Sequence, residues 1–258
     1  MNYKILNFTT LILILGILIT VNWWDFSWNL LWVPILVWLS IVAVFSFNIC
    51  WNFFVKSIHS GKTKEKKIAL SFDDGPHPEW TLKVLEILKK HNAKATFFCI
   101  GKNVQYYPEI VKKISENGHT IGNHSFSHSG FIDFNGTKSW MKEIEETDLE
   151  IQKLVGFRPK FFRPPFGVTT PHLADALRKS GHISIGWNIR TYDTVLKSPE
   201  EIAQKVLRKV KPGSIVLLHD CHKNIIPILE NLLPGLAHKN FSFVTVNELI
   251  DEKPYAEI

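Results

Sequence analysis

The first 56 residues carry apolar runs that are much longer than those in the rest of the chain. No charged residue occurs between Lys4 and Asp25, and none occurs between Asp25 and Lys56. Each run is long enough to cross the hydrocarbon core of a bilayer, about 30 Å thick, as a helix. The pattern predicts a two-helix transmembrane hairpin over residues 1–56. The alternatives are a cleaved signal peptide followed by one anchor, and a hairpin buried in the core of the protein.

Aromatic and basic residues flank the two apolar runs as they do in membrane proteins. The aromatic residues around the link at Asp25 are Trp23, Trp24, Phe26, Trp28 and Trp32. Such clusters are typical of the membrane–water interface. A polar linker at residues 57–66 follows, and the lysines in and around it are Lys56, Lys62, Lys64, Lys66 and Lys67. Lysine is enriched on the cytoplasmic side and binds anionic headgroups, so we expect a two-pass protein with its large domain on the cytoplasmic face.

Beyond the linker, short apolar runs alternate with amphipathic stretches. The strand-like runs lie at 67–72, 95–100, 120–123, 160–163, 183–188, 214–219 and 242–246. The helix-like stretches lie at 81–91, 108–117, 138–155, 171–180, 199–210 and 224–238. This alternation predicts an α/β domain over residues 67–252 with a parallel sheet and helices outside it. A closed or nearly closed barrel and an open doubly wound sheet both fit, and both bind ligands at the carboxyl ends of their strands.

Polar residues with catalytic chemistry gather at those predicted strand ends. They are Asp73, Asp74, His124, His128, Arg163, Asp193, His219 and Asp220. Two carboxylates at the end of one strand can divide the work, because one can bind a metal while the other moves a proton. The H-x-x-x-H spacing of His124 and His128 places both imidazoles on one side of a turn or helix. One carboxylate and two imidazoles make a three-ligand site for a divalent metal, with Zn²⁺ the expected ion.

Four motifs in the order of the chain carry a resemblance to a known family. They are Ser71-Phe-Asp-Asp-Gly-Pro76, His124-Ser-Phe-Ser-His128, Arg163-Pro-Pro-Phe-Gly167 and Leu217-Leu-His219. With them, residues 67–250 resemble the polysaccharide deacetylase family, also called NodB-type domains or carbohydrate esterase family 4. The resemblance implies a distorted (β/α)7 barrel and a divalent metal, often zinc.

The resemblance also implies a role for each matched position. Asp74, His124 and His128 are the implied metal ligands. Asp73 is the implied general base, held by an ion pair with Arg163. His219 is the implied general acid, tuned by Asp193. The implied substrate-binding positions are Pro165, Phe166, whose backbone N–H helps to bind the oxyanion, and Leu217, which forms part of the wall around the acyl group.

The fourth motif departs from the family pattern. Where the family commonly has two aspartates three apart and then tryptophan, this chain has Arg190, Asp193 and Thr194. The apolar wall for the acyl group therefore lacks its usual tryptophan, and either the pocket is roomier or Trp187 or Tyr192 fills the space. Arg190 adds a positive charge that suits an anionic substrate such as a phosphate-linked sugar.

Composition excludes other classes of protein. The net charge of +6 comes largely from the lysines near the linker, and no arginine-rich stripe interleaved with aromatic residues suggests nucleic-acid binding. The chain has 3 cysteines and no C-x-x-C pair, which argues against a disulfide framework and a zinc–cysteine site. No obligate protein partner is evident. His77, His119 and His222 lie near motif positions, and we expect them in turns or cavity walls.

We therefore expect a membrane-anchored, metal-dependent hydrolase that removes N-acetyl groups from an amino-sugar glycan or a lipid-linked sugar. One alternative is a hydrolase of another non-peptide carbon–nitrogen bond, such as a formamide or cyclic amide, which Thr194 suggests. The other is a non-catalytic glycan-binding membrane protein on the same barrel. Such proteins usually lose a metal ligand or the base, whereas Asp73 and Asp74 are both present here.

Overall fold

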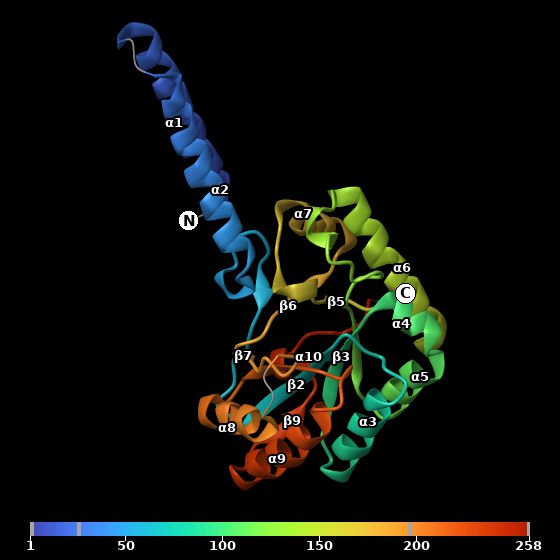
Figure 1. Ribbon diagram of the computed structural model, residues 1–258. Coiled ribbons are helices and arrows are strands. Elements are labelled where there is room, and N and C mark those ends of the chain that lie inside the picture. Colours follow the sequence, from blue (N-terminus) through green and yellow to red (C-terminus); the bar gives the residue numbers. More distant parts are fainter. Residues whose placement is uncertain (1–2, 25–26, 196–197, 257–258) are drawn as a thin grey trace.

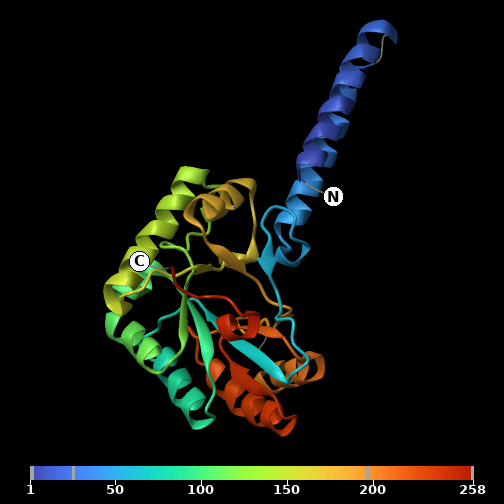
Figure 2. The same cartoon turned by 180° about the vertical axis from the view of Figure 1, so that it is seen from behind.

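A slender pair of helices projects from an α/β domain in the computed structural model of the protein, which describes residues 3–24, 27–195 and 198–256 (Figure 1). The pair consists of α1 (Tyr3–Trp24) and α2 (Trp32–Ser46), and the short 3₁₀ helix η1 (Trp28–Leu31) leads into α2. The two helices run side by side (Figures 1 and 2), and Trp38 Nε1 donates a hydrogen bond to Asn7 Oδ1 at 2.8 Å. The expected link at Asp25 and Phe26 lies outside the described residues.

The helix pair is apolar and uncovered. The stretches Tyr3–Val21 and Trp28–Ser46 are long and apolar enough to cross a membrane, and only 11% and 6% of them are buried. A hairpin in the protein core would be covered by the domain, so that alternative is wrong. Length and composition are compatible both with membrane spans and, for the first helix, with a signal sequence.

The segment after α2 differs from the expected boundaries. The hairpin was expected to reach residue 56, but α2 ends at Ser46, and Ile49 and Val55 are 2% and 6% exposed against the domain. The 3₁₀ helix η2 (Ile49–Trp51) lies in this segment. Residues 57 and 58, expected in the linker, form strand β1 (Ser57–Ile58), which pairs with β6. The Ser57 and Ser184 hydroxyls form a hydrogen bond of 2.7 Å, so the buried Ser57 hydroxyl has a partner inside the sheet.

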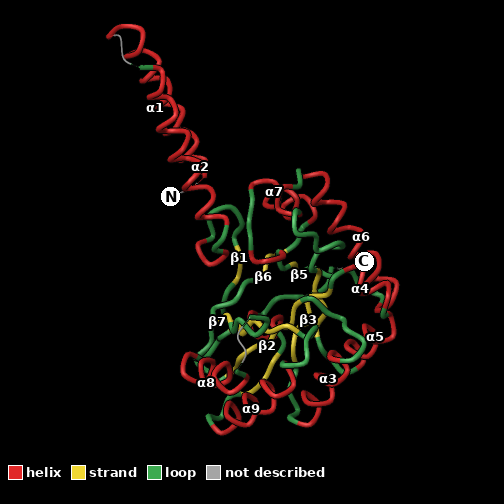
Figure 3. Tube along the Cα trace, viewed as in Figure 1, coloured by secondary structure: helices red, strands yellow, loops and turns green. Residues whose placement is uncertain are grey.

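The sheet is parallel and curled (Figures 1 and 3). Its other strands are β2 (Lys67–Asp73), β3 (Ala95–Cys99), β4 (Thr120–Asn123), β5 (Phe161–Phe162), β6 (Ile183–Ile185), β7 (Ile189–Arg190), β8 (Ile215–His219) and β9 (Ser242–Val244). Their order is β1-β6-β5-β4-β3-β2-β8-β7, and β9 pairs with the first half of β2.

One segment links the two sides of this curled, partly open barrel. The expected single strand at 183–188 is split: β6 pairs with β5, whereas β7 pairs with β8 at the other side. Only Gly186, Trp187 and Asn188 separate the two pieces. The Arg163 guanidinium donates from Nε to Ile185 O and from Nη2 to Gly186 O, both at 3.0 Å, so a side chain takes the place of strand pairing at the break. The barrel implied by the family resemblance is confirmed in this distorted form.

Helices cover the outside of the barrel (Figure 3). They are α3 (Trp80–Lys90), α4 (Gly101–Tyr106), α5 (Pro108–Glu116), α6 (Thr137–Val155), α7 (Pro171–Ser180), α8 (Pro199–Lys209), α9 (Ile225–His238) and α10 (Val246–Ile250), with the 3₁₀ helices η3 (Ile132–Phe134) and η4 (Pro165–Gly167). The sequence pattern missed α4 and α10, because helices of 6 and 5 residues are too short to show helical periodicity.

Strand β2 shows how the two faces of the sheet differ. Side chains alternate between faces along a strand. Ile68, Leu70 and Phe72 are fully buried in the large core cluster that the outer helices cover. Ser71 and Asp73 lie on the inner face, where both hydrogen bond with one arginine. The outer face of β2 therefore stabilises the fold, and its inner face leads to the mouth of the barrel.

Candidate active site

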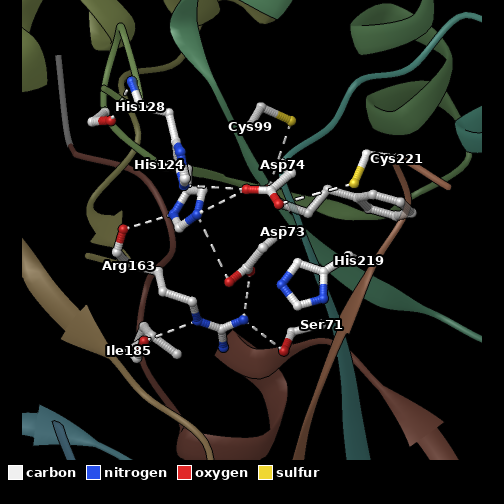
Figure 4. Close-up of polar contacts among 12 residues, drawn as sticks. Ser71, Asp73, Asp74, Cys99, His124, His128, Arg163, Ile185, His219 and Cys221 are labelled. Atoms are coloured by element: carbon white, nitrogen blue, oxygen red, sulfur yellow. Dashed lines mark hydrogen bonds and ion pairs between the residues drawn. The ribbon is translucent and has the colours of Figure 1, made fainter. Parts of the chain in front are cut away.

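A cavity of about 260 Å³ opens at the carboxyl ends of the strands. Its lining residues are Asp73, Asp74, His124, His128, Phe166, Gly167, Trp187, Arg190, Tyr192, Thr194, Val195, Leu217 and His219. These residues come from distant parts of the chain, and Figure 4 shows the side chains of Asp73, Asp74, His124, His128 and His219 close together. Of the residues predicted at the strand ends, Asp73, Asp74, His124, His128 and His219 line the cavity. Arg163 and Asp193 lie behind them, and the buried Asp220 accepts a hydrogen bond from Thr81.

Three side chains at this mouth have the geometry of a metal site. Asp74 Oδ1 lies 3.4 Å from His124 Nε2 and 3.3 Å from His128 Nε2, and the three donor atoms lie within 4.8 Å of one another. His124 Nδ1 is 2.8 Å from the carbonyl oxygen of Arg163. Because a carbonyl only accepts, Nδ1 carries the proton and Nε2 keeps its lone pair for a metal. The donor set therefore fits a divalent cation.

Burial and charge support the same protonation states. Burial by itself raises the pKa of the Asp74 carboxyl, but the hydrogen bond and charge of His124, with His219 and His128, lower it overall. Desolvation lowers the pKa of His128, and the nearby His124 adds to this effect. An ionised carboxylate and a neutral imidazole are the forms that bind a metal.

The backbone places these ligands through left-handed turns. Neighbouring side chains in an extended strand point to opposite faces. Asp73 is the last residue of β2, whereas Asp74 has φ 72°, so the chain turns and both carboxylates reach the cavity. Ser125 and His128 have φ 65° and 47°. A left-handed conformation costs a residue with a Cβ about 1–2 kcal/mol, and such strain is concentrated at functional sites.

Glu143 on α6 fixes the loop that carries the two histidines. Its Oε2 accepts the backbone N–H groups of Phe126 at 2.9 Å and Ser127 at 2.7 Å, and its Oε1 accepts the Ser127 hydroxyl at 2.8 Å. One carboxylate thus satisfies both donors at the centre of the loop. Because the loop is pinned there, His124 and His128 converge on Asp74.

Asp73 and Arg163 form an ion pair that is shielded from solvent. Arg163 Nη1 donates to Asp73 Oδ1 at 2.7 Å and to Ser71 Oγ at 2.9 Å, and the arginine side chain is 0% exposed. Its guanidinium carbon lies 4.1 Å from the centre of the Phe98 ring. Removing one partner of such a pair typically costs about 3–5 kcal/mol, because the other charge is left buried alone. The pair fixes the Asp73 carboxylate at the cavity.

His219 lies beside Asp73 because the two residues are partners in the pairing of β2 with β8. Asp193 holds the imidazole: its Oδ1 is 2.8 Å from His219 Nδ1, and its Oδ2 accepts the His219 backbone N–H at 2.8 Å. Burial by itself lowers the pKa of His219, but the hydrogen bond and charge of Asp193 outweigh it and raise the pKa to about 9. The His219 imidazole is therefore protonated at neutral pH.

The acyl-binding side of the cavity contains part of the expected set. Phe166 has φ 57°, and its ring lies edge-on to the His128 ring, with the ring centres 4.7 Å apart. Phe166 and Leu217 both line the cavity. Pro165 is buried and is not among the lining residues, so its contact with substrate stays a prediction. Trp187 is 6% exposed and belongs to the same apolar cluster as Leu217.

Of the two residues considered for the wall usually formed by tryptophan, Trp187 fits that place better than Tyr192. Both line the cavity, but the Tyr192 side chain is 46% exposed, whereas Trp187 packs against Gly167. A Cβ at Gly167 would lie 2.5 Å from Trp187 Cη2, so the tight third-motif turn makes room for the indole ring. Thr194 lines the same cavity.

Four supporting residues escaped the sequence analysis. They are Ser71, Glu143, Thr191 and His222. Thr191 donates to Leu217 O at 2.7 Å and lies 2.7 Å from Asp193 Oδ1, and His222 Nε2 is 3.2 Å from Asp193 Oδ2. His222 was expected in a turn or cavity wall; it lies in a bend and also contacts the carboxylate that holds His219. The sequence offered only one hint of this contact, namely that His222 follows His219 closely. Asp193, which contacts both histidines, lies in a different connection between strands.

Fold and site together define an α/β domain whose mouth brings carboxylates and histidines around one cavity, with three of them placed as candidate metal ligands. Comparison with known proteins gives the family: the profile of the family described as "Polysaccharide deacetylase" matches residues 60–184. A peptidoglycan-N-acetylglucosamine deacetylase of Bacillus cereus is 36% identical over 191 residues, 72% of this chain and 69% of its own length. The chain belongs to the polysaccharide deacetylase family, and the expected class, a hydrolase of non-peptide carbon–nitrogen bonds, is confirmed.

Solved structures agree with this assignment. A peptidoglycan N-acetylglucosamine deacetylase in complex with an N-oxidanyl-benzamide compound is 34% identical, with a TM-score of 0.73 over 77% of this chain and 94% of that one. A family 4 acetyl xylan esterase from Clostridium thermocellum, in complex with a cobalt ion, is 36% identical, with a TM-score of 0.66 over 71% and 89%. Some longer curated relatives are matched over only 42% or 40% of their length.

Loss of the Glu143 carboxylate should weaken metal binding. We expect Glu143→Ala to lower the affinity for Zn²⁺ or Co²⁺ about 10–100-fold, the usual effect of losing support behind metal ligands. Isothermal titration of the metal-depleted full chain in detergent measures this. Glu145→Ala is the matched control, because Glu145 is exposed on the same helix. Equal affinities for the two variants would contradict the role of Glu143.

Asp193→Asn should move the alkaline limit of activity. The His219 acid loses its proton as the pH rises through about 9. Without the Asp193 charge, its pKa should fall toward the ordinary value of about 6.5, so the rate should decline at lower pH. A kcat–pH profile measures the shift, with the exposed Asp251→Asn as control. An unchanged alkaline limb, even with a lower rate, would rule out this tuning.

Proposed function

We propose that the protein is a membrane-anchored, metal-dependent deacetylase that removes N-acetyl groups from amino sugars of peptidoglycan or of a lipid-linked glycan. One observation carries the proposal: the metal-binding, basic and acidic side chains line a single cavity. The peptidoglycan deacetylases among its relatives support the substrate class. Zinc is the proposed ion, since one carboxylate and two imidazoles are ligands that zinc prefers.

The base and the acid stand beside each other on neighbouring strands. Asp73 accepts a proton from the attacking water while the new carbon–oxygen bond forms at the carbonyl carbon of the N-acetyl group. Arg163, 2.7 Å from Asp73, stabilises the ionised carboxylate before the step and holds it in position. A bound divalent metal would supply electrophilic activation at the site formed by Asp74, His124 and His128.

His219 completes the reaction as the proton donor. The carbon–nitrogen bond breaks with its electron pair going to nitrogen, and the His219 proton makes that nitrogen a neutral amine. The products are acetate and a free amino sugar. The backbone N–H of Phe166 is proposed to stabilise the negative charge that develops on the carbonyl oxygen of the substrate. The support for this role is the left-handed backbone of Phe166, with φ 57°, at the wall of the cavity.

Asp73→Asn should abolish catalysis while leaving the metal ligands in place. We expect acetate release from N-acetylglucosamine oligomers and membrane-bound glycan to fall about 10²–10⁴-fold, the usual contribution of a general base. Acetate, formate and metal content are measured on the same detergent-purified full chain, with the exposed Asp175→Asn as control.

The result also separates the competing functions. Wild-type release of formate instead of acetate would favour the deformylase alternative. Wild-type activity retained by Asp73→Asn would contradict the proposed mechanism. Full cellular function of the inactive variant would favour the non-catalytic glycan-binding alternative.

The helix pair is proposed to be a two-pass anchor. The lysines after it favour a cytoplasmic position for the domain, whereas assembled peptidoglycan lies on the outer side. From the charges we expect a β-galactosidase fusion after Ile258 to be active and an alkaline phosphatase fusion there to be inactive. The reverse pattern would place the domain outside, with direct access to polymer.

A further inference from the structure

A second cavity of about 260 Å³ adjoins the catalytic cavity at the base of the helix pair. Its lining residues are Phe47, Asn48, Ile49, Cys50, Trp187, Asn188, Arg190 and Tyr192. Trp187, Arg190 and Tyr192 line the catalytic cavity as well. The two cavities therefore share one wall, and that wall contains an arginine.

The base of the helix pair is fixed to the catalytic domain. The backbone N–H of Thr169 donates to Ser46 O at 3.0 Å, and the Cys50 thiol donates to Trp187 O at 3.3 Å. Ile49 is 2% exposed and packs in the cluster that contains Trp187. The second cavity is thus a built feature, with one side from the segment after α2 and the other from the segment that closes the barrel.

This arrangement sets the depth of the second cavity relative to the proposed membrane. If α2 spans the bilayer, the residues just after Ser46 lie among the lipid headgroups. Phe47 and Trp51 are 72% and 51% exposed, as is common for aromatic side chains at that interface. The second cavity therefore lies between the headgroup layer and the catalytic cavity.

Arg190 gives the shared wall a positive charge. Its guanidinium carbon lies 5.6 Å from the centre of the Trp187 ring and 4.9 Å from that of Tyr192. Among the described residues no carboxylate forms an ion pair with it, and its side chain is exposed. Arginine held against aromatic rings keeps N–H donors for a phosphate, which it can bind through two parallel hydrogen bonds.

We infer that the second cavity binds the phosphate of a glycan that is linked through phosphate to a membrane lipid, with Arg190 as the phosphate-binding residue. The N-acetyl sugar then occupies the catalytic cavity, and the lipid chain stays in the bilayer beside the helix pair. The inference rests on the proposed deacetylase function and names the substrate class for the same site. A soluble sugar phosphate carries the same phosphate group but no lipid chain, so it serves as the comparison.

The test compares three probes with the full chain in vesicles of neutral phospholipid. They are N-acetylglucosamine joined through phosphate to farnesol, farnesyl N-acetylglucosaminide without phosphate, and soluble N-acetylglucosamine 1-phosphate. Acetate release gives kcat and KM for each. We expect the phosphate-linked lipid to have the lowest KM. Arg190→Gln should raise the KM of this probe on the order of tenfold more than it raises the KM of the neutral lipid, with kcat nearly unchanged.

Two matched variants separate a specific contact from general charge. Lys205 lies on Tyr192 as Arg190 does, with its Nζ 4.5 Å from the ring centre, but it lines neither cavity. Lys205→Gln should therefore leave the KM ratio of the two lipid probes within about twofold of the wild-type ratio, as expected for a screened surface charge. Arg190→Lys, which keeps the charge, should retain part of the preference for phosphate.

The outcomes distinguish this inference from the proposed function. Equal KM values for the two lipid probes, or equal effects of Arg190→Gln on both, would overturn the phosphate site and leave the deacetylase standing. A soluble sugar phosphate that is used as well as the lipid-linked probe would overturn the membrane-borne substrate. No acetate from any probe would contradict the proposed function, and this inference with it.

Discussion

The buried guanidinium of Arg163 connects the closure of the barrel to the chemistry at its mouth. It donates to the carbonyls of Ile185 and Gly186, where strand pairing is interrupted, and to the carboxylate of Asp73. Its own backbone carbonyl accepts from His124, which orients a metal ligand. A fully buried cation has a large desolvation cost, and here several acceptors and an opposite charge offset it. The residue that holds the end of β6 therefore also positions Asp73 and His124.

A second constraint comes from the end of strand β2. A strand delivers alternate side chains to one face, so Ser71 and Asp73 share the inner face, and Asp74 would be directed away if the strand continued. The left-handed turn at Asp74 brings it back to the cavity. The pairing of β2 with β8 places His219 next to Asp73. The positions of Asp73, Asp74 and His219 thus follow from one turn and one strand register.

The apolar helix pair is joined to the domain through a short segment in which Ile49 and Val55 are buried, whereas Phe47 and Trp51 are exposed. Residues 47–58 pack against the barrel and contribute strand β1 and one wall of the second cavity. A flexible tether would let the domain sample many distances from a bilayer, whereas this junction holds the cavity mouths near the end of α2. If the helix pair spans a membrane, as proposed, this proximity favours substrates in the same bilayer, because it raises their effective concentration at the site.

Much of this protein could be predicted from the order of its residues. The apolar runs, the alternation of strands and helices, and the motifs around Asp73, His124, Arg163 and His219 are local in sequence, so they indicated the class of fold and the chemical groups of the site. Helices with proline or glycine at their ends, such as α7 and α8, matched their expected ranges closely, because those signals act within one turn. The family motifs added the roles that spacing alone leaves open.

Tertiary structure decided what depends on distant segments. The split of 183–188 into β6 and β7 arises from two different neighbours, β5 and β8, and no local pattern encodes it. The same is true of β1, whose two residues Ser57 and Ile58 pair only because β6 lies beside them, and of His222, whose partner Asp193 comes from another connection. The placement of Arg190 between two cavities also requires the fold. Local sequence fixes which groups are available, whereas pairing and packing between remote segments fix which of them meet.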